Sequence, residues 1–175
     1  MPHRNLNENW RTCFEELAPK LLLYARQWLP MRADAEDAVQ NAFVKFWKQQ
    51  PDAGREHYPL LYSAVRSAAL DLIRQRTRRT GREAKLAEDG VFTPDASWFE
   101  APEEATRETQ AAIVEALARL PGAQREVLAL RIWGELTFRQ IAEVAGESIN
   151  TIAARYRSAL EALRRTMKPR EYERV

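Results

Sequence analysis

The sequence contains few of the residues that build disulfide frameworks and metal centres. Cys13 is the only cysteine, and the two histidines, His3 and His57, are far apart along the chain. A single cysteine gives no intrachain disulfide, and the histidines do not have the spacing of metal ligands. The chain also has no glycine-rich phosphate loop and no paired carboxylates with catalytic partners. We therefore expect a protein without a cofactor, a metal or catalytic activity of its own.

Long apolar runs are missing as well. No segment approaches the roughly 20 apolar residues that a membrane-spanning helix requires. The N-terminal residues, MPHRNLNENW, lack the hydrophobic core of a signal peptide. We therefore expect a cytoplasmic, reduced protein that does not insert into a membrane.

Glycine is scarce, with six residues in 175, and the apolar spacing is helical almost throughout. A hydrophobic fraction of 45% with 30% charged residues is typical of a soluble, helix-rich protein. The length allows one medium domain or two small domains, each near the lower limit for an independent core. These features predict an all-α fold.

Charge is strongly segregated along the chain, although the net charge is only +2. Basic residues dominate from 66 to 85, acidic residues from 86 to 110, and arginines again from 125 onward. This order suggests two modules that bind a polyanion, joined by a segment that a nucleic acid would repel. The predicted parts are a small helix bundle at 1–80, a flexible linker at 81–102 and a small helical domain at 103–175.

Three helices are predicted in the N-terminal part. The first covers 6–29, with Pro19 kinking it or dividing it in two. Asp34 can cap the second, and the third runs from about Pro59 through Ile73 into the sequence QRTRRTGR. Helices with such short connections form a compact bundle. The apolar face of the second helix consists of Ala35, Ala38, Val39, Ala42, Phe43, Phe46 and Trp47.

The segment 137–165 has the pattern of a helix-turn-helix. Thr137 and Gln140 form a capping box that starts one helix, and Gly146 supplies the left-handed residue that ends it. Ser148 can cap the next helix. The second helix of such a motif enters the major groove of DNA by its N-terminal end. Its apolar stripe consists of Ile149, Ile152, Tyr156, Leu160 and Leu163.

The face opposite this stripe presents small and short polar residues between two arginines. Arg155 and Arg157 suit phosphates on the two walls of a groove, and the residues between them can approach base edges. The residues expected to contact DNA are Asn150, Thr151, Ala154, Arg155, Arg157 and Ser158. An ordinary amphipathic surface helix also carries arginines, but the agreement of cap, turn and stripe favours DNA binding. Glu147 stands in the turn where an aliphatic residue is usual, and we expect Ile149 to fill that space.

Three segments, in this order, resemble parts of the extracytoplasmic-function (ECF) sigma factors of bacterial RNA polymerase. They are DAEDAVQNAFVKFW (34–47), LYSAVRSAALDLIRQRTRR (61–79) and LARLPGAQREVLALRIWGELTFRQIAEVAGESINTIAARYRSALEALR (117–164). Their order, their spacing and the linker between them carry the resemblance more than any single motif. It implies a subunit that binds core polymerase, selects promoters through the −10 and −35 elements and helps to open them.

The resemblance also implies the partners. In the family, the polar face of the helix at 34–47 grips the clamp helices of the polymerase β′ subunit. The residues to which this role carries over are Asp37, Gln40 and Asn41. A solvated helix face is the alternative for each of them. The other implied contacts are with the polymerase β flap, with promoter DNA and with an anti-sigma factor.

The resemblance assigns the −10 element to the helix at 61–79 and to the loop before it, which capture a base flipped from the melting strand. Such a site needs groups that stack on bases and cations that neutralise phosphates. The residues expected there are Tyr62, Arg66, Ser67, Arg74, Arg78 and Arg79. Tyr62 can stack on a base or belong to the core. Ser67 departs from the Asn of many relatives, and Asp71 matches a family Asp that can also simply pair with an arginine.

The recognition helix departs from the commoner family pattern as well. Many relatives have Lys or Arg and then Ser at the positions of Ala153 and Ala154. Alanine cannot hydrogen-bond to a base edge, although its methyl group can pack on thymine. We therefore expect −35 readout to depend on Asn150, Thr151, the two arginines of the helix and DNA shape.

Two other classes of protein are alternatives. A stand-alone transcriptional regulator would use the helix-turn-helix on an operator and the N-terminal bundle for dimerisation or sensing. Co-purification with core polymerase separates this class from a sigma factor. A small helical enzyme or an RNA-binding factor would need a polar pocket, which two distant histidines and one cysteine do not provide.

Overall fold

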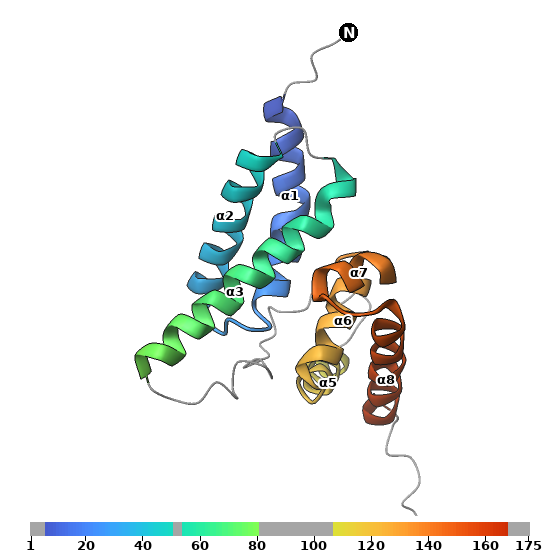
Figure 1. The fold of residues 1–175 in the computed structure, drawn as a ribbon. Coiled ribbons are helices and arrows are strands. Elements are labelled where there is room, and N and C mark those ends of the chain that lie inside the picture. Colours follow the sequence, from blue (N-terminus) through green and yellow to red (C-terminus); the bar gives the residue numbers. More distant parts are fainter. Residues whose placement is uncertain (1–5, 51–53, 81–106, 168–175) are drawn as a thin grey trace, which may run out of the picture.

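The computed structural model describes residues 6–50, 54–80 and 107–167, which form helices and their connections (Figure 1). No strand occurs within these ranges, so the all-α prediction is confirmed. The predicted linker at 81–102 lies outside the described residues. The elements are α1 (Leu6–Ala25), α2 (Arg32–Gln49), η1 (Arg55–His57), α3 (Tyr58–Thr80), α5 (Arg107–Ala118), α6 (Gly122–Ile132), α7 (Phe138–Ala145) and α8 (Ile149–Met167).

The N-terminal domain is the predicted bundle of α1, α2 and α3. α1 continues through Pro19 as one helix, and this proline is exposed. The predicted cap at Asp34 is wrong, because α2 begins earlier, with Met31 at its N-cap position and no side-chain cap hydrogen bond. Asp34 lies in the first turn instead, where its carboxylate pairs with Arg76 of α3. An acidic residue there still suits the positive end of the helix dipole.

The apolar face of α2 is buried as predicted, except for its last member. Trp47 is 41% exposed, and its ring stacks on that of Trp10 from α1 at a centroid distance of 4.3 Å. The helical period correctly places Trp47 beside the core. At this end of the α1–α2 pair the ring of Trp10 covers Trp47, and the rest of the Trp47 ring is exposed to solvent.

The helix-turn-helix forms as its local pattern predicts. The Thr137 hydroxyl accepts from the Gln140 amide at 3.2 Å, and the Gln140 side chain accepts from the Thr137 amide at 2.9 Å. Gly146 ends α7 with a φ of 70°, in the left-handed region. The Ser148 hydroxyl then accepts from the Thr151 amide at 3.1 Å, which caps α8. These five residues fix the turn between α7 and α8.

The expected apolar stripe of α8 begins later than predicted. Ile152 is fully buried, and Tyr156 packs edge-on against Phe138 of α7. Ile149, in contrast, is exposed and does not replace the missing aliphatic residue of the turn. The first turn of α8 extends beyond the cover of α7, so a residue in the register of the stripe stays in solvent there.

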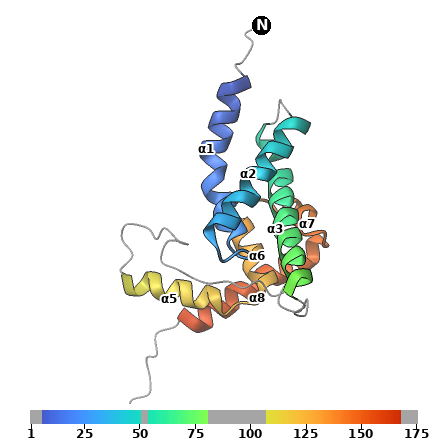
Figure 2. The same ribbon diagram turned by 90° about the vertical axis from the view of Figure 1, so that its left-hand side faces the viewer.

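The two domains pack directly against each other. α3 lies along α7, and α1 reaches α6 (Figures 1 and 2). The main cluster of buried residues is continuous across this boundary, running from Tyr24 and Tyr62 to Val127, Leu130 and Ile141. Each domain alone has few core residues, and docking lets both complete their burial of apolar surface. No helix within the described ranges is long and apolar enough to cross a membrane.

Replacing Gly146 tests the turn. A Cβ at this position would meet nothing within 4 Å, so the cost of Gly146→Ala comes from the left-handed backbone alone. We expect Gly146→Ala to lower the free energy of unfolding by about 1 kcal/mol, and Gly146→Asn to lower it less, because asparagine tolerates this conformation. Denaturant unfolding of both variants provides the measurement. Equal losses in the two variants would show that the turn does not depend on this conformation.

Candidate nucleic-acid interface

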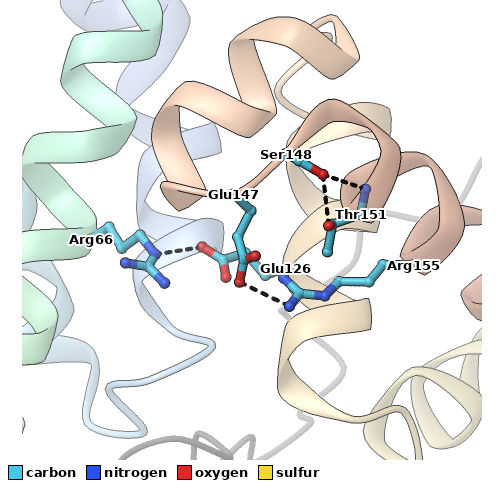
Figure 3. A network of polar contacts seen from close by, with 6 residues as sticks. All are labelled: Arg66, Glu126, Glu147, Ser148, Thr151 and Arg155. Atoms are coloured by element: carbon cyan, nitrogen blue, oxygen red, sulfur yellow. Dashed lines mark hydrogen bonds and ion pairs between the residues drawn. The ribbon is translucent and has the colours of Figure 1, made fainter.

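The recognition helix α8 presents the predicted DNA-contacting face to solvent. Asn150, Ala154 and Ser158 are exposed at steps of one helical turn, and Arg157 is exposed on their flank. Thr151 is half-buried, and its hydroxyl lies 2.8 Å from that of Ser148, so it is held by the helix cap (Figure 3). This face of α8 therefore offers the Arg157 guanidinium and several small side chains to a DNA groove.

Arg155 differs from Arg157, although the sequence placed them as a symmetric pair. Its guanidinium donates to the Glu147 carboxylate at 2.9 Å, and its side chain is 30% exposed (Figure 3). Glu147, the unusual acidic residue of the turn, therefore serves as the partner of this arginine. It holds the Arg155 side chain back toward the N-terminal domain.

The residues predicted for the −10 element separate into two groups on α3. Ser67, Arg74, Arg78 and Arg79 are exposed, and Arg74 pairs with Asp71 one turn away at 3.2 Å. That pair lies within one helix and is well exposed, so it contributes little to stability and does not hold the bundle together. The exposed group forms a cationic end of the helix that suits phosphates.

Tyr62 belongs to the second, buried group. It is 1% exposed, and its ring packs edge-on against Tyr24 at a centroid distance of 5.3 Å. Its hydroxyl has no hydrogen-bond partner among the described residues. Burial raises the pKa of this hydroxyl, and the charges of Glu135 and Glu16 raise it further. In this arrangement Tyr62 is a core residue and is not available to stack on a base.

Arg66 is the other residue outside the exposed group, and it is partly buried. Its guanidinium donates to Glu126 of α6 at 2.8 Å, with the Arg66 side chain 31% exposed (Figure 3). The same Glu126 oxygen accepts from the Tyr24 hydroxyl at 2.8 Å. A residue expected to bind DNA thus forms an ion pair with the opposite domain.

Sequence reasoning missed Glu126, and the helical period contains no signal for it. α6 buries six consecutive residues, from Arg125 to Leu130, so it is covered on all sides. A surface helix shows one polar face, and a helix that is covered all round does not. Only the neighbours of α6 reveal that the two charged residues in this run point into protein.

A cleft of about 590 Å³ lies between the domains beside this ion pair. Trp28, Leu70 and Ala145 contribute its apolar walls. Its charged lining consists of Arg66, Arg74, Arg155, Glu126 and Glu147. Glu126 and Glu147 thus line this cleft together with arginines of both domains. The cleft therefore contains mixed charge and is not a purely cationic groove.

The three residues predicted to bind polymerase share one exposed face of α2. Asp37, Gln40 and Asn41 are spaced three and four residues apart, and Val44, also exposed, continues the same stripe. Beside them, the seam between α1 and α2 forms an apolar groove of about 450 Å³ that includes Phe14, Val44 and Trp47. The predicted polymerase-binding surface thus includes apolar residues. One of them, Trp47, was expected from the sequence to lie in the core.

Two family models match the chain, in the order of its two domains. They are Sigma-70 region 2 over residues 13–79 and Sigma-70, region 4 over residues 116–165. The ECF RNA polymerase sigma factor RpoE of Cereibacter sphaeroides is 27% identical over 157 residues, covering 88% of this chain and 83% of the relative. The ECF RNA polymerase sigma factor SigL of Mycobacterium tuberculosis is 26% identical over 162 residues, covering 90% and 88%.

A solved structure supports the same fold. The sigma factor RpoE of Bartonella quintana, in complex with the anti-sigma factor NepR, superposes with a TM-score of 0.68 at 20% sequence identity. The superposition covers 94% of this chain and 99% of that one.

A helical region 2 followed by a region 4 with its helix-turn-helix defines the sigma-70 class of RNA polymerase subunits. Within that class, the chain belongs to the ECF sigma factors, as its sequence pattern predicts. It binds RNA polymerase, directs promoter-specific initiation of transcription and is not itself an enzyme.

Two substitutions of Tyr62 separate its ring from its hydroxyl. The ring is buried, so we expect Tyr62→Ala to lower the free energy of unfolding by ~3–5 kcal/mol. The hydroxyl is buried without a described partner, so Tyr62→Phe should be neutral or stabilising. Chemical denaturation measures both. A loss of more than about 1 kcal/mol in Tyr62→Phe would mean that the hydroxyl makes a hydrogen bond that matters.

Proposed function

We propose that α8 reads the −35 element through Asn150, Thr151, Ala154, Arg155, Arg157 and Ser158. The observation that carries this proposal is the exposed line of small residues on α8, the second helix of a helix-turn-helix whose two helices are both capped. Arg157 lies on the flank of that line, where a phosphate would lie in a major-groove complex. Arg155 joins the interface when it exchanges Glu147 for a phosphate.

The −10 element is bound, in this proposal, by α3. Arg74, Arg78 and Arg79 supply phosphate contacts from the exposed end of the helix, and Ser67, which directly follows Arg66, is exposed. Arg66 takes part only after Glu126 of α6 has released it, and Tyr62 only after it has left the buried cluster. The domains of the proposed function keep the predicted boundaries, 1–80 and 103–175, joined by 81–102.

The polymerase-binding surface proposed here is the exposed stripe of α2. Asp37, Gln40 and Asn41 offer polar and negative groups to the β′ clamp helices, and the neighbouring Val44 and Trp47 add apolar contact area. The C-terminal domain would meet the β flap. An anti-sigma factor, the partner named for the Bartonella quintana structure, would inhibit the chain by competing for such surfaces. A protein with these partners works in the cytoplasm.

The DNA proposal is tested on holoenzyme, with promoters mapped by in vitro transcription of genomic fragments. Arg155→Ala or Arg157→Ala should weaken promoter binding by ~1–3 kcal/mol if the arginine reads a base, or reduce the salt slope by about one unit if it binds a phosphate. Arg165→Ala, near the other end of α8, is the matched control. Wild-type affinity and salt slope in both variants would contradict the proposed interface.

The polymerase proposal predicts that Asp37→Ala, Gln40→Ala and Asn41→Ala, combined, abolish co-purification with core polymerase. All three side chains are exposed, so the thermal stability of the triple variant should change little. Asp71→Ala with Gln75→Ala, two exposed positions on α3, is the control and should bind core polymerase normally. A triple variant that unfolds would show that these residues are structural, and one that binds normally would place the surface elsewhere.

A further inference from the structure

The first turn of the recognition helix α8 carries an exposed isoleucine that the proposed function does not use. Ile149 is 44% exposed, and it is the one large apolar side chain exposed in the helix-turn-helix at 137–165, all of which the structure describes. A side chain in solvent gains nothing from burial, and a β-branched residue is a poorer helix former than alanine. The folding of this chain therefore does not account for an isoleucine at this position.

The other side chains in the first turns of α8 offer few hydrogen bonds to DNA. The hydroxyls of Ser148 and Thr151 lie 2.8 Å apart, and that of Ser148 also accepts from the Thr151 amide at 3.1 Å (Figure 3). The two alanines of the next turn, Ala153 and Ala154, have no polar group to offer to a base. In this part of α8, which is fully described, Asn150 is thus the exposed side chain left to form hydrogen bonds with base edges.

Apolar contact is the other way in which a side chain distinguishes bases in the major groove. The groove presents one apolar group, the C5 methyl of thymine, which apolar side chains can contact. The residues at the N-terminal end of a recognition helix are those that approach the base edges. Ile149 is the first residue of α8, and the small side chain of Ala153 one turn later lets the helix come close to the bases.

We infer that Ile149 is a specificity-determining residue of the −35 interface, which recognises a thymine through its C5 methyl group. The inference rests on the proposed function, because it takes α8 as the helix that reads the −35 element. Asn150 supplies hydrogen bonds to a neighbouring base, and Ile149 excludes water from the thymine methyl beside it. The −35 element of this protein accordingly contains a thymine whose methyl group contributes to holoenzyme binding.

The test removes the two apolar groups separately and together. Ile149→Ala shortens the side chain, and a promoter with deoxyuridine in place of one −35 thymine lacks only the methyl group. Holoenzyme binding to a mapped promoter is measured for each −35 thymine on either strand. The readout is the ratio of the Kd for the uracil promoter to the Kd for the thymine promoter. Changes in folding or in core polymerase binding affect both promoters equally and leave this ratio unchanged.

Two controls match these changes. Ile132→Ala is the same substitution at an isoleucine of α6 that is 47% exposed and is not among the residues proposed to bind DNA or polymerase. Deoxyuridine in the spacer between the −35 and −10 elements controls for the effect of uracil on duplex DNA. Ile149 is exposed and alanine favours a helix, so Ile149→Ala should unfold at the same temperature as wild type or slightly higher.

We expect uracil at one −35 position to raise the Kd of wild type and of Ile132→Ala roughly three- to fivefold, the effect of one buried methyl group. Ile149→Ala should weaken binding to the thymine promoter by roughly five- to twentyfold and bring the uracil ratio at that position close to one. The absence of any methyl effect in wild type, or a methyl effect that persists in Ile149→Ala, would overturn the inference.

Arg157→Ala in the same assay separates this inference from the proposed function. If Arg157→Ala weakens promoter binding or reduces the salt slope while the uracil ratio does not depend on Ile149, the −35 interface stands and the inference about Ile149 fails. Wild-type behaviour of Arg155→Ala, Arg157→Ala and Ile149→Ala alike would instead contradict the proposed interface as a whole.

Discussion

One buried carboxylate links the two docked domains. Glu126 is 6% exposed, and it accepts hydrogen bonds from the Tyr24 hydroxyl and the Arg66 guanidinium across the domain boundary. Hydrogen bonds to an ionised acceptor are stronger and more directional than neutral ones, so this contact sets where α6 lies against α1 and α3. The apolar surfaces around this contact supply the rest of the docking energy, but apolar contacts are not directional and do not fix the position of α6 as closely.

Both domains are small, and this explains why they share a core. Leu117, Leu120, Leu128 and Ala159 form a separate cluster within the C-terminal domain, while the other face of α6 completes the core of its neighbour. Because α6 packs against both domains, separating the domains would expose apolar surface to water. The docked form therefore gains stability from the same helix that positions the helix-turn-helix.

The proposed DNA contacts are affected unequally by docking. The exposed line on α8 and the cationic end of α3 face solvent in the docked form, whereas Tyr62 is buried and Arg66 is paired with Glu126. Sequence-independent phosphate contacts are thus available to the free chain, and the groups proposed to act on the melting −10 strand are withheld. This division suits a subunit whose role in opening DNA belongs to the complex with polymerase.

Local chemistry alone determined much of this protein. The capping box at Thr137, the left-handed Gly146 and the Ser148 cap depend on residues within a few positions of each other, and all three predictions were correct. The order of the segments and their family resemblance could also be predicted from the sequence, because helical periods and runs of charge can be recognised without knowing the fold. The exposed positions of Asp37, Gln40 and Asn41 followed from the same period.

Tertiary structure decided what covers each face. A period of 3.6 residues tells which side chains share a face but not where the covering helix ends, so Trp47 and Ile149 were assigned to the core although both are exposed. Nor does it distinguish an arginine that faces DNA from one that faces a carboxylate 60 residues away, as with Arg66 and Glu126. Contacts between residues distant in sequence depend on how the domains dock. The energy of docking is spread over surfaces formed by many segments, so no local sequence pattern predicts it.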